Sequence, residues 1–155
     1  MKLNTKSLAG VEYGFVVLST GSYAARIKSV DLKPNKDKTG NNCVVVHQVL
    51  DRTVTDAHGK VVNNNGNIQF TRWVGMQPND EKNYDPDRSI KELAVACGVP
   101  EDFDGDLDSS MLVGKVVTVK VAYKEAKDGF AEGNDVKGWL PATDEAKALG
   151  ANSPF

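Results

Sequence analysis

The segment Val113–Lys124 constrains the fold of this chain more than any other. Its apolar side chains recur at every second position, at Val117, Val119, Val121 and Tyr123. A period of two places alternate side chains on opposite faces of a strand, whereas helical side chains repeat about every 3.6 residues. The segment therefore predicts a long β-strand with one buried face.

Four further segments predict shorter strands, over residues 23–32, 43–50, 68–74 and 135–140. Each combines β-branched or aromatic residues with flanking residues that are typical of turns. Lys33–Asn42 contains Pro, Gly and several Asn and Lys residues, which predicts a loop between the first two strands. Glu125–Asn134, with two glycines, predicts another loop before the last strand.

One helix is expected between the third and fourth strands. Apolar residues fall at i, i+3, i+4 and i+7 within Arg88–Cys97, with Asp87 as the expected N-cap and Gly98 just beyond the end. Three strands, a helix and two strands is the order of the OB-fold, a five-stranded Greek-key barrel. We therefore expect a mainly β protein with one OB-fold domain over residues 1–142, including an N-terminal extension (1–14), and a short C-terminal tail (143–155).

Composition narrows the functional class. The formal net charge is −2, unlike that of a histone-type protein that coats duplex DNA, although basic residues on one face can still bind a nucleic acid. The longest apolar runs are far shorter than the roughly 20 residues that span a membrane. No signal peptide is recognised, so a cytoplasmic protein is expected. Cys43 and Cys97 are interpreted as buried free thiols.

The sequence does not indicate catalysis. The acidic repeat from Asp102 to Asp108 lacks the glycine and glutamate positions of an EF-hand loop in either register. His47 lies in a buried-looking strand and His58 in a turn, and neither is placed to activate a nucleophile. We therefore expect a protein that is not an enzyme and needs no metal or cofactor.

Three motifs carry a resemblance to a known family. They are Phe15-x-x-Leu18-x-x-Gly21-x-Tyr23-x-x-x-Ile27, Leu112-Val113-Gly114-Lys115 and Asn134-Asp135-Val136-Lys137-Gly138-Trp139-x-Pro141. In order and spacing they resemble small phage-encoded single-stranded DNA-binding proteins with an OB-fold. The resemblance implies binding of single-stranded DNA during bacteriophage DNA replication or recombination, in the cytoplasm of a bacterial host.

The chain ends in Pro154-Phe155. This dipeptide resembles the end of bacterial single-stranded DNA-binding proteins, which docks replication partners. The acidic run that precedes it in those proteins is missing here. Two interpretations stay open: a tail that docks replication or recombination proteins, and a frayed terminus.

Sequence-tolerant binding of single strands needs exposed aromatic rings for base stacking and a basic groove for the phosphates. Strand parity points Trp73 and Trp139 outward, and places Arg72 on the inward parity at the rim of a short barrel. Other cations fall on polar strand faces and in the two loops that flank the OB-fold cleft. The expected nucleic-acid-binding residues are Arg26, Lys28, Lys33, Lys36, Lys38, Arg72, Trp73, Lys120, Lys124, Lys127, Phe130, Lys137 and Trp139.

The competing hypothesis is a non-enzymatic OB-fold adaptor that binds protein partners. The two tryptophans separate the hypotheses. Exposure of both Trp73 and Trp139 near the lysine-bearing loops would favour nucleic acid, whereas their burial would favour the adaptor.

Overall fold

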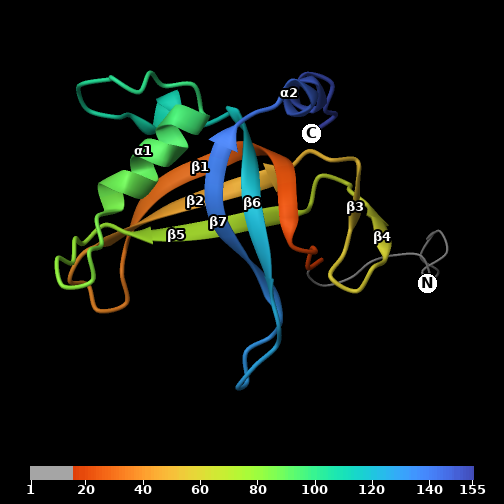
Figure 1. The fold of residues 1–155 in the computed structure, drawn as a ribbon, viewed down its shortest axis with the longest axis horizontal. Coiled ribbons are helices and arrows are strands. Elements are labelled where there is room, and N and C mark those ends of the chain that lie inside the picture. Colours follow the sequence, from red (N-terminus) through yellow and green to blue (C-terminus); the bar gives the residue numbers. More distant parts are fainter. Residues whose placement is uncertain (1–15) are drawn as a thin grey trace, which may run out of the picture.

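The computed structural model describes residues 16–155, and these form a mainly β structure (Figure 1). The strands are β1 (Gly21–Pro34), β2 (Asn41–Val49), β3 (Thr53–Thr55), β4 (Val61–Asn63), β5 (Gln69–Gly75), β6 (Val116–Lys124) and β7 (Gly133–Pro141). The helices are α1 (Pro86–Ala96), the 3₁₀ turn η2 (Ser109–Met111) and α2 (Asp144–Ala151). The expected N-terminal extension, residues 1–14, and Phe15 of the first motif lie outside the described residues.

Five strands form one antiparallel sheet in the order β5-β2-β1-β6-β7, and β3 pairs with β4 in a separate hairpin. The long strand β1 lies at the centre of the large sheet. Its first part pairs with β6 and its second part with β2, with a β-bulge between Ile27 and Ser29. A bulge bends a strand and increases its twist, which here helps the sheet to curl.

The predicted barrel needs two corrections. The edge strands β5 and β7 contact each other, yet in the described part of the chain no hydrogen-bonded ladder joins them, so the sheet does not close. The second correction concerns helices, because α2 occupies a segment that was interpreted as a loose tail. The Thr143 side chain accepts from the Ala146 amide and caps α2, a signal that the sequence interpretation missed.

The main core fills the concave side of the curled sheet and is covered at one end by α1 (Figure 1). Leu93, Ala94 and Ala96 form the buried face of α1. The helix begins two residues earlier than expected, because the Asp85 side chain caps it and Pro86 occupies its first turn. Gly98, with φ of +96°, follows its end.

The opposite side of the sheet is partly covered by the C-terminal segment. Ala146 of α2 packs with Ala24 and Leu50 in a second, smaller cluster. The Phe155 ring lies against Gly66, where an added Cβ would come within 2.9 Å of it. In the described residues, no helix has the length and apolar character needed to cross a membrane.

Candidate nucleic-acid interface

Trp73 lies on the outer face of β5, as the alternation predicts. It is 56 % exposed and is paired across the ladder with Val44 of β2. Gln69 and Thr71 precede it on the same face and are also exposed. An exposed indole on an open sheet face is available for stacking against a planar ligand.

Trp139 is buried, at 1 % exposure, so its predicted outward position is wrong. The cause is a β-bulge in β7: Lys120 pairs with Gly138, but Val121 pairs with Val136, which leaves Lys137 as the extra residue. A single extra residue reverses the parity of everything that follows it. Trp139 therefore enters the core, and Leu140 becomes 41 % exposed in its place.

Trp139 belongs to a buried polar network. Its Nε1–H donates to Nε2 of His47 at 2.7 Å, and Nδ1 of His47 lies 3.0 Å from the Phe70 carbonyl oxygen. Because an indole nitrogen can only donate, His47 must accept at Nε2 and donate from Nδ1. Burial lowers the pKa of His47 to about 4, which keeps the ring neutral.

Arg72 also points inward, beneath α1. Its guanidinium carbon lies 4.3 Å from the centre of the Trp139 ring, a cation–π arrangement. Its Nη1 is buried without a hydrogen-bond partner among residues 16–155, and burial lowers the pKa of the guanidinium. Arg72 thus helps fill the gap between β5 and β7. Its inward orientation agrees with the predicted parity, and the side chain is partly exposed.

Arg26 has a structural contact of its own. Its guanidinium donates to the carbonyl oxygens of Gly114, at 3.2 Å, and Gly150, at 2.7 Å. Gly150 lies in the last turn of α2, where a cation is favourable beside the unpaired carbonyls. The structure therefore places Arg26 on the outer face opposite Gln48, where α2 covers it, at the other end of that face from Trp73.

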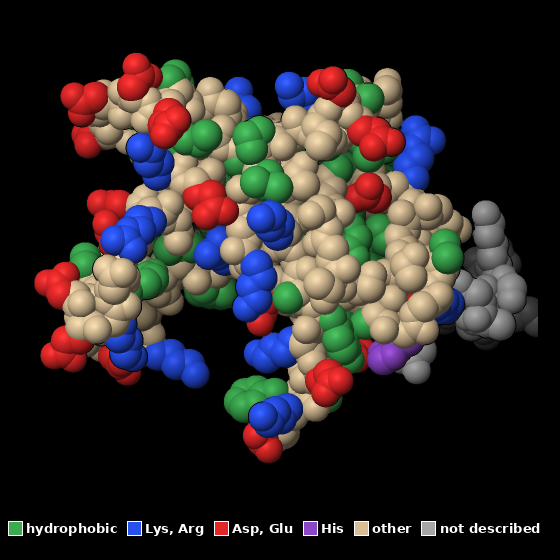
Figure 2. Space-filling view, in the orientation of Figure 1, with side chains coloured by type: hydrophobic (Ala, Val, Ile, Leu, Met, Phe, Trp, Pro, Cys, Tyr) green, Lys and Arg blue, Asp and Glu red, His purple; other side chains and the backbone are tan. Residues whose placement is uncertain are grey.

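Two projecting segments carry exposed lysines. Lys33, Lys36 and Lys38 lie at the end of β1 and in the following loop, and Lys124 and Lys127 lie on the β6–β7 hairpin. Figure 2 shows a hollow between the β1–β2 loop and this hairpin, with Lys and Arg side chains on both of its sides. Phe130, 74 % exposed, lies in the hairpin turn. These residues therefore lie on opposite sides of the hollow.

Acidic residues lie close to the lysines of the β1–β2 loop. The loop 76–85 lies beside the β1–β2 loop, joined by a hydrogen bond from the Met76 amide to the Asn41 carbonyl and by the side chain of Gln77 against Gly40. Asp80 and Glu81 therefore lie in the same lobe as the lysines. The lobe has mixed charge, so its lysines are partly balanced.

The remaining predicted cations lie elsewhere. Lys28 is the exposed bulge residue of β1. Lys120 lies on the outer face of β6, opposite Gly138. Lys137 lies 3.9 Å from the Asp135 carboxylate. In the sheet order, β1 separates Lys120 and Lys137 from the β2–β5 face, so they do not line the same surface as Trp73.

The base of the hairpin is fastened to the β3–β4 turn. Glu132 accepts hydrogen bonds from the Tyr123 hydroxyl, at 2.8 Å, and from Nε2 of His58, at 3.0 Å. The hydrogen bond to Glu132 raises the pKa of His58, and the bonds from Tyr123 and His58 lower the pKa of Glu132. This link supports the hairpin from the side away from its lysine-bearing tip.

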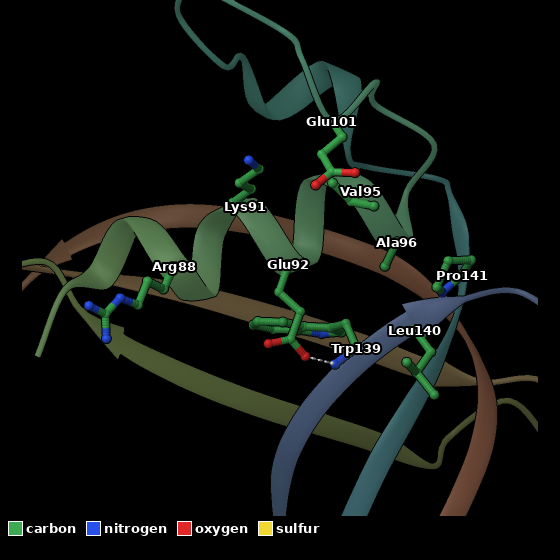
Figure 3. Close-up of a pocket in the computed structure, with 9 residues that line it drawn as sticks. All are labelled: Arg88, Lys91, Glu92, Val95, Ala96, Glu101, Trp139, Leu140 and Pro141. Carbon is green, nitrogen blue, oxygen red and sulfur yellow. Dashed lines mark hydrogen bonds between the residues drawn. The ribbon is translucent and has the colours of Figure 1, made fainter.

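A separate groove of about 460 Å³ lies between α1 and β7 (Figure 3). Val95, Leu140 and Pro141 give it apolar walls, with Arg88 and Lys91 on the helix. The Glu92 carboxylate turns inward and accepts a hydrogen bond from the Trp139 backbone amide at 2.7 Å.

Both cysteines are buried and free, as expected, and burial raises the pKa of each thiol.

The two tryptophans therefore favour neither hypothesis outright, because one is exposed and the other is buried. Trp73 is exposed, with the lysine-bearing β1–β2 loop near its end of β5, whereas Trp139 is part of the core. The sequence interpretation also passed over Asp31 and Gln48 as candidate ligand contacts. Strand parity was the available signal, since both lie on the outer face with Trp73.

No curated protein sequence matches this chain. One family model does match, over residues 4–148, and its description is "Protein of unknown function (DUF669)". Because the match spans most of the 155 residues, the chain belongs to the DUF669 family.

Proposed function

We propose that this protein binds single-stranded DNA on the outer face of β2 and β5, between the β1–β2 loop and the β6–β7 hairpin. The exposed indole of Trp73 is the observation that carries the proposal. A large aromatic ring left in water forgoes on the order of 2 kcal/mol of burial free energy. Such exposure is understandable where a base stacks on the ring.

The strand order supports the same proposal. Numbered within the large sheet alone, the order is 3-2-1-4-5, and α1 lies between the third and fourth strands. We propose that this is an open variant of the OB-fold, whose ligands lie on the face of strands two and three between these two loops. Phe130 would supply a second stacking ring, and the loop and hairpin lysines would contact phosphates. From the resemblance to phage proteins, we propose that this binding serves DNA replication or recombination in the host cytoplasm.

The experiment is a titration with a mixed-sequence single strand and a duplex of equal length, followed by tryptophan fluorescence at two salt concentrations. Because Trp139 is buried, quenching reports on Trp73. We expect quenching by the single strand, weaker binding at higher salt, and no quenching in Trp73→Phe. Trp139→Phe is the matched control and should retain the response. Absence of binding to the single strand at low salt would reject the proposal.

A protein-binding adaptor is the second candidate, and the groove between α1 and β7 favours it. Its apolar walls include Leu140, which the bulge of β7 exposes. A partner that also recognised Pro154-Phe155 would have to displace the Phe155 ring from Gly66. The same titration separates the candidates, because an adaptor would not be quenched by DNA.

A further inference from the structure

The outer face beside Trp73 carries hydrogen-bond acceptors, and its nearest cation is Lys33, one row further toward the β1–β2 loop. Across the three strands, Asp31, Val44 and Trp73 form one row, and Gln48 pairs with Gln69 in a row further along. Three cations border the strip made by Asp31, Gln48, Gln69, Thr71 and Trp73 without entering it. Arg72 points inward, Arg26 opposite Gln48 is held under α2, and Lys33 lies in the next row toward the β1–β2 loop. A phosphate would meet the Asp31 carboxylate there, so this strip suits bases better than backbone.

Two acceptor groups on the strip make no hydrogen bond within the described residues, the Asp31 carboxylate and the Gln48 amide oxygen. The exposed Asp31 carboxylate has no partner among the described residues, and Gln48 uses only its amide N–H, which donates to the Gly66 carbonyl at 2.9 Å. The Asp31 carboxylate and the Gln48 amide oxygen are therefore left to accept hydrogen bonds from a ligand. Cytosine and adenine carry an exocyclic amine that donates to such acceptors, whereas thymine presents a carbonyl oxygen at the equivalent position.

The distances fit a single base. Adjacent strands are about 4.8 Å apart, which puts the backbones of Asp31 and Trp73 roughly 10 Å apart with Val44 between them. A base stacked on the indole can extend over Val44 toward the carboxylate. We propose, building on the single-strand binding put forward above, that Asp31 selects bases with an exocyclic amine over thymine, while the rim lysines hold the phosphates. Gln48, four residues further along β2 and roughly 13 Å away, would face a different base.

The test compares oligo-dC with oligo-dT of equal length at neutral pH, since both are pyrimidines with similar backbone flexibility. We expect wild type to bind oligo-dC about fivefold more tightly or better, the effect of roughly one charge-assisted hydrogen bond. Asp31→Asn keeps the shape but lets the amide donate or accept, so the ratio should fall toward one. Asp37→Asn is the matched control, because it removes an acidic charge from the adjoining loop and should leave the ratio unchanged.

Equal affinities for the two strands in wild type, or tighter binding of oligo-dT, would overturn the inference while leaving single-strand binding intact. So would an unchanged ratio in Asp31→Asn. A mixed-sequence strand distinguishes the other failure: if that strand also does not bind, the proposed function itself is wrong. Thermal unfolding of each variant checks that the fold is retained.

Discussion

The indole Nε1–H of Trp139 donates a 2.7 Å hydrogen bond to Nε2 of His47, deep between the curled sheet and α1. This contact joins β7 to β2, two strands that are not neighbours in the sheet. The Arg72 guanidinium stacks on the indole ring, and the network occupies the region where β5 and β7 approach without pairing. It therefore supports the open edge of the sheet through side chains in place of a backbone ladder.

The first prediction concerns pH and His47. Burial holds the pKa of His47 at about 4 in the folded state, against 6.5 when it is exposed. The unfolded chain therefore binds more protons between these values, and the free energy of unfolding should fall as pH drops from about 6.5 to 4. The loss should approach about 3 kcal/mol. Urea unfolding across this pH range measures it.

His47→Gln is the matched variant, because an amide can accept from Trp139 and donate to the Phe70 carbonyl without titrating. Its stability should depend less on pH in this window than that of wild type. Parallel pH profiles for the two proteins would contradict the assignment of this dependence to His47.

Strand alternation in the sequence was enough to predict most of the large sheet. Period-two alternation located β5 and β6, where no bulge interrupts it, and the continuous β-branched run Cys43–Leu50 located β2. Alternation failed in β7, where Lys137 is an extra residue. Alternation cannot reveal an extra residue, because a bulge depends on pairing with a partner strand.

The sequence likewise predicted only part of the candidate site. The loop and hairpin lysines, Trp73 and Phe130 could be placed from local signals. The roles of Arg26 and Arg72 could not, since each depends on an element distant in sequence: α2 for Arg26, and Trp139 for Arg72. Long-range packing decided both positions.

The second prediction tests the bulge directly. Deleting Lys137 removes only the extra residue, so Val136 and Gly138 should keep Val121 and Lys120 as partners and Trp139 should stay inward. An outward indole would expose roughly 200 Å² at a cost of about 5 kcal/mol, a large part of the stability of a typical domain. We therefore expect the deletion variant, in a Trp73→Phe background, to keep the blue emission of a buried Trp139. Lys137→Ala keeps the extra residue and should resemble wild type; red-shifted emission from a folded deletion variant would refute the explanation.

The third prediction concerns Arg72, which the sequence assigned to DNA binding. Arg72→Met keeps a long apolar side chain over Trp139 and removes the unpartnered Nη1. Losing the cation–π contact costs about 1 kcal/mol, and removing a buried unsatisfied donor returns a similar amount. Stability should therefore stay within about 1 kcal/mol of wild type, and affinity for single strands should not change. A marked loss of affinity in a stable Arg72→Met protein would show that Arg72 contributes to DNA binding.

The last prediction concerns the number of phosphate contacts. Each lysine that neutralises a phosphate of a single strand adds about 0.7 to the slope of log affinity against log salt concentration. Lys36→Gln/Lys38→Gln should therefore reduce the slope by about 1.4 and weaken binding at low salt. The double variant Lys124→Gln/Lys127→Gln should act similarly from the other side of the hollow. Lys147→Gln, on the exposed side of α2, changes the net charge but should leave the slope unchanged. If all three proteins gave the wild-type slope, neither the loop nor the hairpin would contact the DNA backbone, because counterion release counts only the charges that meet phosphates.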